Sequence, residues 1–355
     1  MKRMDLQRSY EVVNKLTSVE RQVLDLVNKR VPHLTRVAAA MLGVSRQAIN
    51  KLVNKLINAD YIKAEGQTRA RKYSLGKNRV YFNSYKLDKK NKLDEHVIWE
   101  DFEHVFDTLK PNVHEICFYG FTEIVNNAID HSDGTELRVC ASLSEGVVDL
   151  MVHDDGEGIF KRIARLRNLS SEKESILELS KGKLTTDPDN HTGEGIYFTS
   201  RVFDNFYIYS SGHLFDHNKE RDIDFLLEHN HDVEGTIVEM QIDANSKTSQ
   251  QDVFDAFAPA DEFSFSKTVV PVRLAIQGKE NLVSRSQAKR VLSRLDRFKT
   301  VILDFEGVEN IGQAFADEIF RIFVKKHPEV TILHTNTNDN VLKWIKRAEN
   351  TKMGV

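Results

Sequence analysis

The hydrophobic pattern of residues 121–159 predicts a helix followed by two strands. Residues 137–143 and 147–153 alternate between apolar and polar positions, as strands do. The second predicted strand runs directly into the polar, glycine-rich sequence Asp-Asp-Gly-Glu-Gly at 154–158. The helix before them is predicted from apolar residues that recur at three- and four-residue spacing, namely Phe121, Ile124, Val125, Ala128 and Ile129.

Polar residues at three points of this pattern are suited to bind a ligand. Glu123 and Asn127 stand four residues apart. A helix places such a carboxylate and amide about one turn apart, where both can reach one ligand. Asp154 ends a predicted strand, and Gly156 and Gly158 after it let the backbone pass close to a flat ligand. Each signal is weak alone, because Asp and Gly are also ordinary turn residues.

Two further glycine-containing blocks follow along the chain. The sequence His-Thr-Gly-Glu-Gly-Ile at 191–196 places Gly193 and Gly195 at a predicted helix start, where free backbone N–H groups suit phosphate oxygens. Thr236 then follows a glycine and precedes an apolar strand at 237–242. The four blocks in this order are much rarer by chance than any one of them.

Together the four blocks resemble the ATP-binding domain that histidine kinases, gyrase B, Hsp90 and MutL share, the GHKL superfamily. The resemblance covers about residues 95–243, and the pattern Glu-x-x-x-Asn-Ala-x-x-His is most similar to that of the anti-sigma-factor serine kinases. It implies a central α/β sandwich of the GHKL (Bergerat) type at 94–245, with ATP and Mg²⁺ as cofactors.

Matched residue by residue, the resemblance also implies a role for each site residue. Glu123 corresponds to the general base and Asn127 to the Mg²⁺ ligand. Mg²⁺ prefers oxygen ligands. A glutamate one turn away would orient water or a hydroxyl for attack on the γ-phosphoryl group. The other matched positions are Asp154, Gly156, Gly158 and Thr236 of the adenine pocket and Gly193 and Gly195 of the phosphate-binding loop.

Residues 160–190 occupy the place in the order where the family has the lid that closes over ATP. Lys181 and Lys183 are candidate phosphate contacts in this segment, although lysines in a loop are more often simply solvated. Several histidines follow, but no Cys or carboxylate pattern accompanies them at zinc-site spacing. The sequence therefore favours a nucleotide site over a zinc site.

Residues 1–76 carry the pattern of three short helices and a hairpin. Helices are expected at 18–29 and 35–42, and a third from the capping residue Ser45 to about residue 59. Strands at 62–65 and 69–75 alternate around a Gly-Gln turn. The arrangement resembles a winged helix-turn-helix, whose third helix enters the major groove of DNA. Winged helices also occur as protein-interaction modules, and the sequence leaves that alternative open.

The charge distribution favours a nucleic-acid partner for this region. The whole chain has a net charge of −3, but residues 1–92 carry 21 Lys and Arg against 7 Asp and Glu. A basic head on an acidic body is typical of a polyanion-binding module, although a solvated basic surface would have the same composition. The resemblance implies binding of double-stranded DNA through Arg46, Gln47, Asn50 and Lys51 of the third helix and Arg69, Arg71 and Lys72 of the wing.

The next segment, residues 77–93, is basic and lacks helical periodicity, which predicts a linker. A helix is expected at 94–109, with Pro111 ending it. No run approaches the roughly 18 apolar residues of a membrane span, and the first residues lack a signal-peptide core, so we expect a cytoplasmic protein. Cys117 and Cys140 lie in apolar surroundings, which favours buried thiols over a disulfide.

The tail, residues 253–355, alternates strands and helices. Strands are expected at 269–276, 300–305 and 330–334, and helices at 284–295, 312–323 and 340–348, which indicates a small sheet with helices packed against it. The sequence 303–311 resembles the core strand and loop of STAS domains, the anti-sigma antagonist fold. Where an antagonist has a phosphorylated serine, this chain has Gly-Gln-Ala-Phe at 312–315, without a hydroxyl.

The sequence as a whole indicates an α/β multidomain protein with two alternative functions. In the first, the winged helix binds DNA and the nucleotide and STAS-like domains switch it, with slow ATP hydrolysis through Glu123. In the second, the chain is a protein serine/threonine kinase or an anti-sigma-like regulator that acts on a separate protein, a sigma-factor or phosphoacceptor type of partner. A homodimer is expected only by analogy with winged-helix and GHKL proteins.

Overall fold

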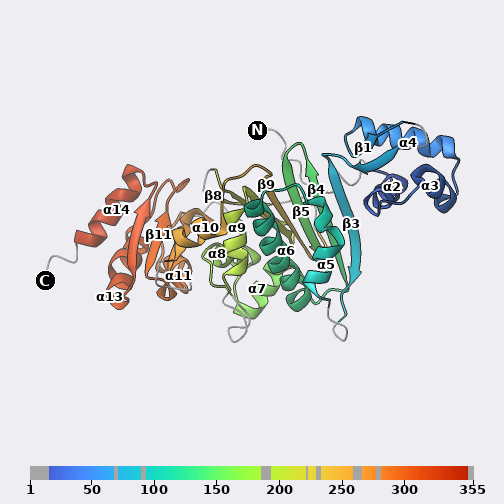
Figure 1. Ribbon diagram of the computed structural model, residues 1–355. Coiled ribbons are helices and arrows are strands. Elements are labelled where there is room, and N and C mark those ends of the chain that lie inside the picture. The colour runs from blue at the N-terminus through green and yellow to red at the C-terminus, as the bar shows by residue number, and fades with distance from the viewer. Residues whose placement is uncertain are drawn as a thin grey trace. The chain divides into compact units, whose positions relative to one another are not determined.

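The computed structural model describes residues 16–67, 71–88, 93–184, 193–220, 223–228, 233–258, 266–276 and 281–350 (Figure 1). The chain is a mixed α/β multidomain protein. It divides into two compact units, residues 1–155 with 237–247 and residues 156–236 with 248–355. None of the helices in the described part of the chain has the length and apolar character that a membrane span requires.

The first unit begins with the predicted three helices and hairpin, α2 (Ser18–Asn28), α3 (Leu34–Leu42), α4 (Arg46–Asn58), β1 (Ile62–Glu65) and β2 (Lys72–Leu75). Thr17 caps α2 in a reciprocal pair with Glu20, and Ser45 caps α4 by accepting the N–H of Ala48 at 3.1 Å. The strands β1 and β2 pair antiparallel. The helices and hairpin are therefore where the sequence predicts them.

Glu20 holds two of these helices together. Its carboxylate is 3% exposed and accepts a hydrogen bond from Lys55 Nζ of α4 at 2.7 Å. Burial raises the pKa of Glu20, but the bonds from Lys55 and Thr17 outweigh it and hold the pKa below its ordinary value. The orientation of α4 thus depends on α2.

The predicted linker at 77–93 is wrong, because Arg79–Lys86 forms strand β3. This strand pairs antiparallel along its whole length with β4 (Glu136–Ser144), with Phe82 opposite Cys140. Aromatic and β-branched residues favour a strand on a half-buried surface, and β3 contains Val80, Tyr81 and Phe82 among its charges. The basic composition of the segment concealed this pattern.

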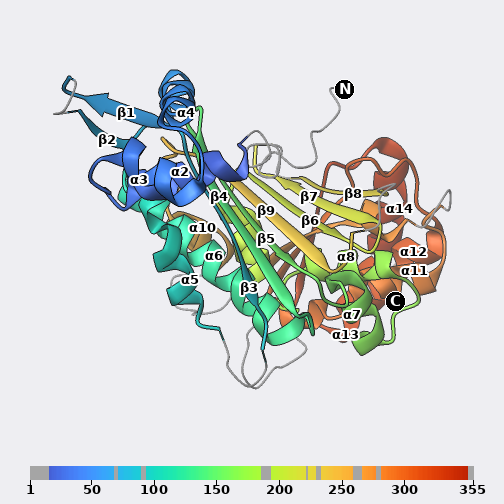
Figure 2. The ribbon, with the colours of Figure 1, turned by 90° about the vertical axis from the view of Figure 1, so that its right-hand side faces the viewer.

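The helical part of this unit differs from the prediction at Pro111. The helix α5 (Glu95–Phe102) ends early and a 3₁₀ turn, Glu103–Val105, follows. Pro111 then begins the long helix α6 (Pro111–His131), since proline is well tolerated at the first helical position. Trp99 of α5 packs on Phe121 of α6 with ring centroids 5.6 Å apart, and both helices lie along the sheet (Figure 2).

The sheet of the first unit contains β3, β4, β5 (Val147–Asp154) and β9 (Thr236–Asp243), in that order. The predicted hairpin at 137–153 is confirmed by the antiparallel pairing of β4 with β5. α6 packs against β5. Cys117 and Cys140 are buried free thiols, as predicted.

The second unit contains an antiparallel meander and, after it, a parallel sheet. The meander is formed by β6 (Asn205–Ser210), β7 (His213–Asn218) and β8 (Ile223–Glu228). The helices of the same part are α7 (Ile159–Arg167), α8 (Glu172–Ser180), α9 (Gly195–Val202) and α10 (Gln250–Phe257).

The C-terminal part of this unit has the predicted alternation of strands and helices. Its parallel sheet has the order β10 (Lys267–Pro271), β11 (Thr300–Asp304) and β12 (Thr331–Thr335). The first strand is shorter than expected, because it ends at Pro271 and continues as the 3₁₀ turn Val272–Ala275. The helices and remaining turns are α11 (Arg285–Leu292), η4 (Leu295–Arg297), α12 (Gln313–Asp317), a π-helical turn (Glu318–Phe323), α13 (Val324–Lys326) and α14 (Asp339–Asn350).

Candidate functional site

The first pair of predicted site residues lies on α6. Glu123 and Asn127 are both partly buried and one helical turn apart. Asn127 Nδ2 donates a hydrogen bond to the backbone oxygen of Glu123 at 2.7 Å. The helix backbone thus binds the Nδ2 atom of the amide and not Oδ1. Oδ1 is the atom that a Mg²⁺ ion would require. The geometry fits the predicted Mg²⁺ ligand.

Asp154 is the last residue of β5, next to the first glycine block. Its side chain is buried, with 6% exposed. Its neighbour Asp155 accepts the backbone N–H groups of Thr135 and Glu136 at 2.6 and 2.8 Å. Burial raises the pKa of Asp155, but these hydrogen bonds outweigh it and lower the pKa. Asp155 thus closes the loop after α6, while Asp154 stays the candidate ligand-binding carboxylate.

In the second unit the fold brings Gly158 next to the Gly235-Thr236 block. Gly158 has φ +91°, and a Cβ built on it would lie 2.6 Å from Ser210 Oγ and 3.3 Å from the oxygen of Gly235. Ile159 N donates to Thr236 Oγ1 at 3.0 Å. Only glycine fits this narrow, left-handed position. Two blocks that are far apart in the sequence therefore meet, which fits a shaped pocket wall.

Ser210 is part of the same wall, although no pattern in the sequence singles it out. Its side chain is buried, and its Oγ donates to the oxygen of Gly235 at 2.9 Å. It ends strand β6 in the sequence Tyr-Ser-Ser-Gly, which is typical of an ordinary hairpin turn. Its local sequence therefore does not distinguish it from other turn serines.

The second glycine block stands at the start of α9. Gly193 has φ +74°, and Leu184 N donates to its backbone oxygen at 3.0 Å. Gly195 is the first residue of α9, and Glu194 before it makes no side-chain capping bond. The first backbone N–H groups of a helix need acceptors from outside the helix, so this end of α9 fits an anion. The preceding residues 191–192 of the block lie outside the described part of the chain.

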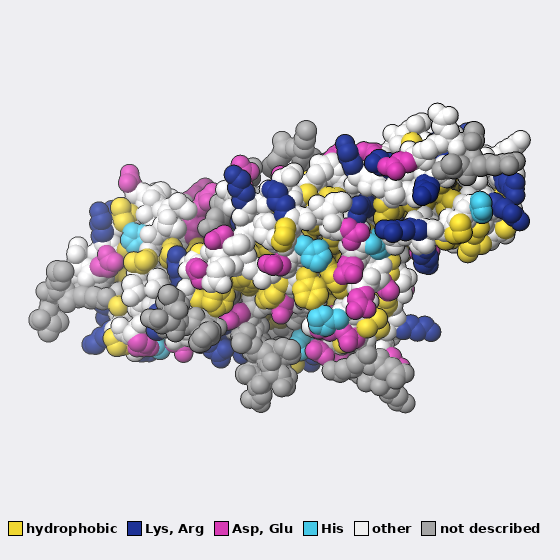
Figure 3. Space-filling model, in the orientation of Figure 1, with side chains coloured by type: hydrophobic (Ala, Val, Ile, Leu, Met, Phe, Trp, Pro, Cys, Tyr) yellow, Lys and Arg dark blue, Asp and Glu magenta, His cyan; other side chains and the backbone are white. Residues whose placement is uncertain are grey.

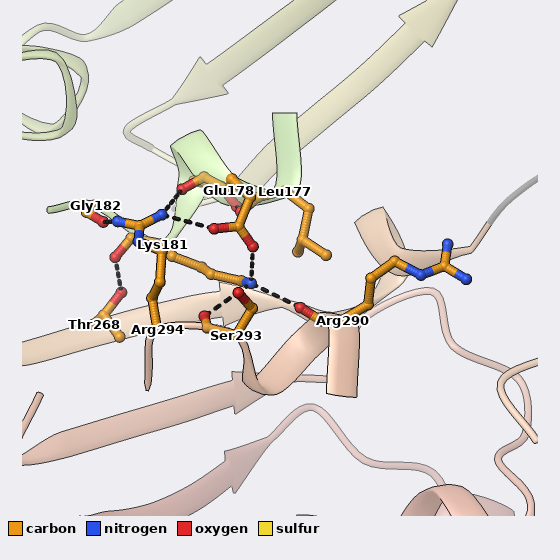
Figure 4. Close-up of polar contacts among 9 residues, drawn as sticks. Leu177, Glu178, Lys181, Gly182, Thr268, Arg290, Ser293 and Arg294 are labelled. Atoms are coloured by element: carbon orange, nitrogen blue, oxygen red, sulfur yellow. Dashed lines mark hydrogen bonds and ion pairs between the residues drawn. The ribbon is translucent and has the colours of Figure 1, made fainter. Parts of the chain in front are cut away.

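Lys181 has a different environment from the one predicted. Its side chain is fully buried, and Nζ bonds to the Glu178 carboxylate and to the backbone oxygens of Arg290 and Ser293, at 2.8 and 3.2 Å for the last two (Figure 4). Burial lowers the pKa of Lys181 to about 8. An ammonium group has three donors, so none is left for a phosphate in this conformation.

Lys181 is buried because residues 290–297 contact the end of α8. No local pattern in the sequence indicates this contact. Lys183 also faces this segment, with Nζ 3.4 Å from the backbone oxygen of Arg297 and 5.1 Å from the centre of the Phe298 ring. Burial lowers the pKa of Lys183. Lys181 Nζ therefore binds Glu178 and the C-terminal part of the chain, whereas Lys183 Nζ also lies 3.9 Å from the Glu194 carboxylate in the second glycine block.

A second buried charge cluster follows α9. Arg201 donates to both carboxylate oxygens of Asp224 at 2.7 and 2.9 Å, and His217 Nδ1 lies 2.7 Å from the same carboxylate. Burial raises the pKa of Asp224, but Arg201 and His217 outweigh it and hold the pKa well below its ordinary value. Arg273 donates to the backbone oxygen of Asp224. Nδ1 of His217 is thus in contact with the Asp224 carboxylate. Across the described residues no three His, Cys, Asp or Glu side chains form a metal-binding group.

The predicted DNA-reading residues are exposed on one helix. Arg46, Gln47, Asn50 and Lys51 all lie on the first two turns of α4, away from its buried face. Lys and Arg side chains are visible over this part of the chain in Figure 3. Arg71 is exposed beside β2, with its guanidinium 5.5 Å from the Tyr73 ring centre. Lys72 begins β2 and is also exposed, whereas Arg69 lies outside the described residues.

Two strands of the C-terminal sheet, β11 and β12, belong to a segment that matches a known family. Residues 287–342 match a STAS-like domain of unknown function (DUF4325). The match begins in α11 and ends in α14, so it includes β11, β12 and the loop after β11. It confirms the predicted STAS-like domain. A comparison with curated proteins finds no match.

Within the STAS-like domain the loop after β11 is closed by side chains. Asp304 Oδ1 accepts the N–H of Glu306 at 3.0 Å and Nδ2 of Asn336 at 2.9 Å. Gly312 caps α12 and donates its N–H to the oxygen of Leu282 at 2.8 Å. The start of α12, where the resemblance expects a phosphoacceptor, has no hydroxyl among residues 312–315.

Proposed function

We propose that this chain is an ATP-binding, DNA-binding transcriptional regulator of three domains. A winged helix-turn-helix binds duplex DNA, a GHKL-type domain binds ATP with Mg²⁺, and the STAS-like domain takes part in the switch between conformers. The observation that supports it most is the meeting of the Gly158 and Thr236 blocks, which the resemblance assigns to one adenine pocket. The hydrogen bond that joins them, from Ile159 N to Thr236 Oγ1, spans 77 residues of sequence.

The chain's own residues would divide the work of binding. Asp154 would accept the adenine amino group, and Gly158 and Thr236, which the resemblance assigns to the same pocket, would shape its wall. Asn127 would hold the Mg²⁺ ion through Oδ1, and the first turn of α9 at Gly195 would donate N–H groups to phosphate. When bound, Mg²⁺ neutralises charge on the phosphate oxygens. Glu123, one turn from Asn127, would orient the attacking water or hydroxyl.

The DNA contact is supported by exposure and charge. Arg46 and Lys51 stand on the exposed face of α4, and the capping residue Ser45 fixes where that helix begins. Arginine and lysine at such positions contact base edges and phosphates in the major groove.

A second candidate function is a protein serine/threonine kinase or anti-sigma-like regulator that acts on a separate protein. Two observations favour it, the Glu-x-x-x-Asn-Ala-x-x-His pattern at 123–131 and the STAS-like match at 287–342. Residues 312–315, where the resemblance expects the phosphoacceptor, have no hydroxyl, and we propose that in this function the acceptor lies on another chain.

One experiment separates the two functions. The purified protein is incubated with Mg²⁺ and γ-labelled ATP, beside Glu123→Ala and Asn127→Ala variants. If wild type releases free labelled phosphate and both substitutions abolish this release, the result would support the regulator with ATPase activity. Label transferred to a sigma-factor or STAS-type protein added to the reaction would support the kinase. A wild-type protein that binds no ATP in equilibrium dialysis would contradict both.

A further inference from the structure

Residues 182–184 contact both Gly193 and the first turn of α9. Gly182 lies against the ring of Tyr197 in the first turn of α9, since a Cβ on Gly182 would come within 3.0 Å of that ring. Leu184 N donates to the oxygen of Gly193 at 3.0 Å. The position of Gly182 therefore influences where the first turn of α9, with Gly195, can lie.

Arg294 of the STAS-like domain binds the backbone at Gly182. Arg294 Nη1 donates to the Glu178 carboxylate of α8 at 2.7 Å, and its Nη2 donates to the backbone oxygen of Gly182 at 2.7 Å (Figure 4). A single guanidinium thus joins the last turn of α8 to Gly182. Its planar, rigid shape fixes both acceptors relative to each other.

Lys181 and Thr268 hold the same junction from the other side. Lys181 Nζ binds the backbone oxygens of Arg290 and Ser293 at the C-terminal end of α11, where a helix favours a cation. Thr268 Oγ1 donates to the backbone oxygen of Lys181 at 2.7 Å. Glu178 accepts from both Lys181 and Arg294. The contact is therefore a buried, hydrogen-bonded cluster and not a loose surface meeting.

We propose that Arg294 is a positioning residue for ATP phosphate binding, acting from the STAS-like domain through Gly182. The inference rests on the nucleotide-binding function proposed above. Arg294 does not touch the nucleotide in this role. It holds Gly182 against Tyr197, which keeps the N–H groups at the start of α9 arranged for phosphate oxygens before ATP arrives.

Preorganised donors bind an anion more tightly than mobile ones, because less freedom is lost on binding. The STAS-like domain would therefore set the affinity for the phosphates without contributing to the adenine pocket, which the resemblance assigns to Asp154, Gly158 and Thr236. A substitution of Arg294 should then change the affinity for ATP more than the affinity for adenosine. A general structural role would not produce this difference.

The test measures two dissociation constants by titration calorimetry on the full chain, for ATP with Mg²⁺ and for adenosine. For Arg294→Ala we expect Kd for ATP to rise by roughly tenfold or more, while Kd for adenosine changes by less than about twofold. Arg294→Lys should give an intermediate Kd for ATP, because an ammonium can pair with Glu178 but does not span both acceptors. Arg321→Ala is the matched control, since Arg321 belongs to the same domain but binds Asp317.

Each outcome supports or overturns a defined part of the proposal. Suppose that wild type binds both ligands. If Arg294→Ala then weakens the binding of both ligands equally, or of neither ligand, the positioning role is overturned and the nucleotide site stands. If wild type binds neither ligand, the proposed function is overturned and this inference with it. If Arg294→Ala does not fold, Arg294→Lys carries the test, and an unchanged ATP affinity in that variant would overturn the role.

Discussion

Two adjacent carboxylates at the end of β5 have different environments. Asp155 accepts hydrogen bonds from the N–H groups of Thr135 and Glu136 and from Thr135 Oγ1, which ties the strand to the loop after α6. Asp154 is the more buried of the two. The oxygens of Asp155 are engaged by these donors, so Asp155 has little acceptor capacity left for a ligand.

The conformation of Gly158 predicts that an alanine at this position lowers the stability of the fold. Gly158→Ala should destabilise the fold by about 2–4 kcal/mol, because a left-handed φ is strained for alanine and the Cβ would overlap Ser210 Oγ. Gly146→Ala is the control: Gly146 also has a positive φ, +78°, but no atom lies within 4 Å of its added Cβ. Urea unfolding measures both. An equal loss of stability in the two variants would contradict the close approach at Ser210.

Lys181 gives a prediction on the pH dependence of stability. Its pKa is lowered, first by burial, from 10.5 to about 8. The unfolded chain therefore holds more protons at this site between pH 8 and 10.5, and its contribution to stability rises with pH in that window. We expect the free energy of unfolding of wild type, relative to Lys181→Met, to increase from pH 8 to 10. A difference that stays flat or falls would show that Lys181 is not charged and buried as described.

At the scale of elements, α4 carries the DNA prediction. The double variant Arg46→Ala, Lys51→Ala should weaken duplex DNA binding and reduce the slope of log Kd against log salt by about 2, because each of the two side chains neutralises about one phosphate. Lys325→Ala with Lys326→Ala removes the same charge from exposed positions on α13 and should leave the slope unchanged. Fluorescence anisotropy at several salt concentrations measures both. An unchanged slope in the α4 variant would remove this helix from the interface.

The sequence predicts the elements of this chain far better than their contacts. Caps and apolar periodicity locate α2 and α4, and apolar periodicity locates the second half of α6, because those signals are local. The sequence does not indicate β3, because basic residues surround its aromatic core. It does not indicate the start of α6, because Pro111 is taken as a helix end although it begins this helix. The burial of Lys181 has a different origin: its partners Arg290 and Ser293 lie more than 100 residues away, and no spacing rule connects a loop lysine with the end of a distant helix.

At the scale of the whole molecule, two buried clusters join the STAS-like part to the segments around α9. Arg294 binds the end of α8, and Arg273 donates to the backbone oxygen of Asp224, whose carboxylate holds Arg201 of α9. Breaking one partner of a buried ion pair leaves an uncompensated charge, which costs about 3–5 kcal/mol. Coupling between distant sites requires an element with two discrete arrangements, and these buried clusters are the contacts through which the proposed switch would act.

If the three domains form one switch, ATP and DNA must influence each other equally. Addition of Mg²⁺ and ATP should change Kd for duplex DNA by a factor of about 5–150, and DNA should change Kd for ATP by the same factor, because binding free energies are linked. The direction of the change depends on which conformer ATP prefers, so either sign is compatible with the proposal. Asn127→Ala should abolish the effect of ATP while leaving DNA affinity without nucleotide unchanged. Equal DNA affinity with and without saturating ATP would mean that ATP does not distinguish the conformers, and the nucleotide domain would then act on a separate protein, as the kinase alternative requires.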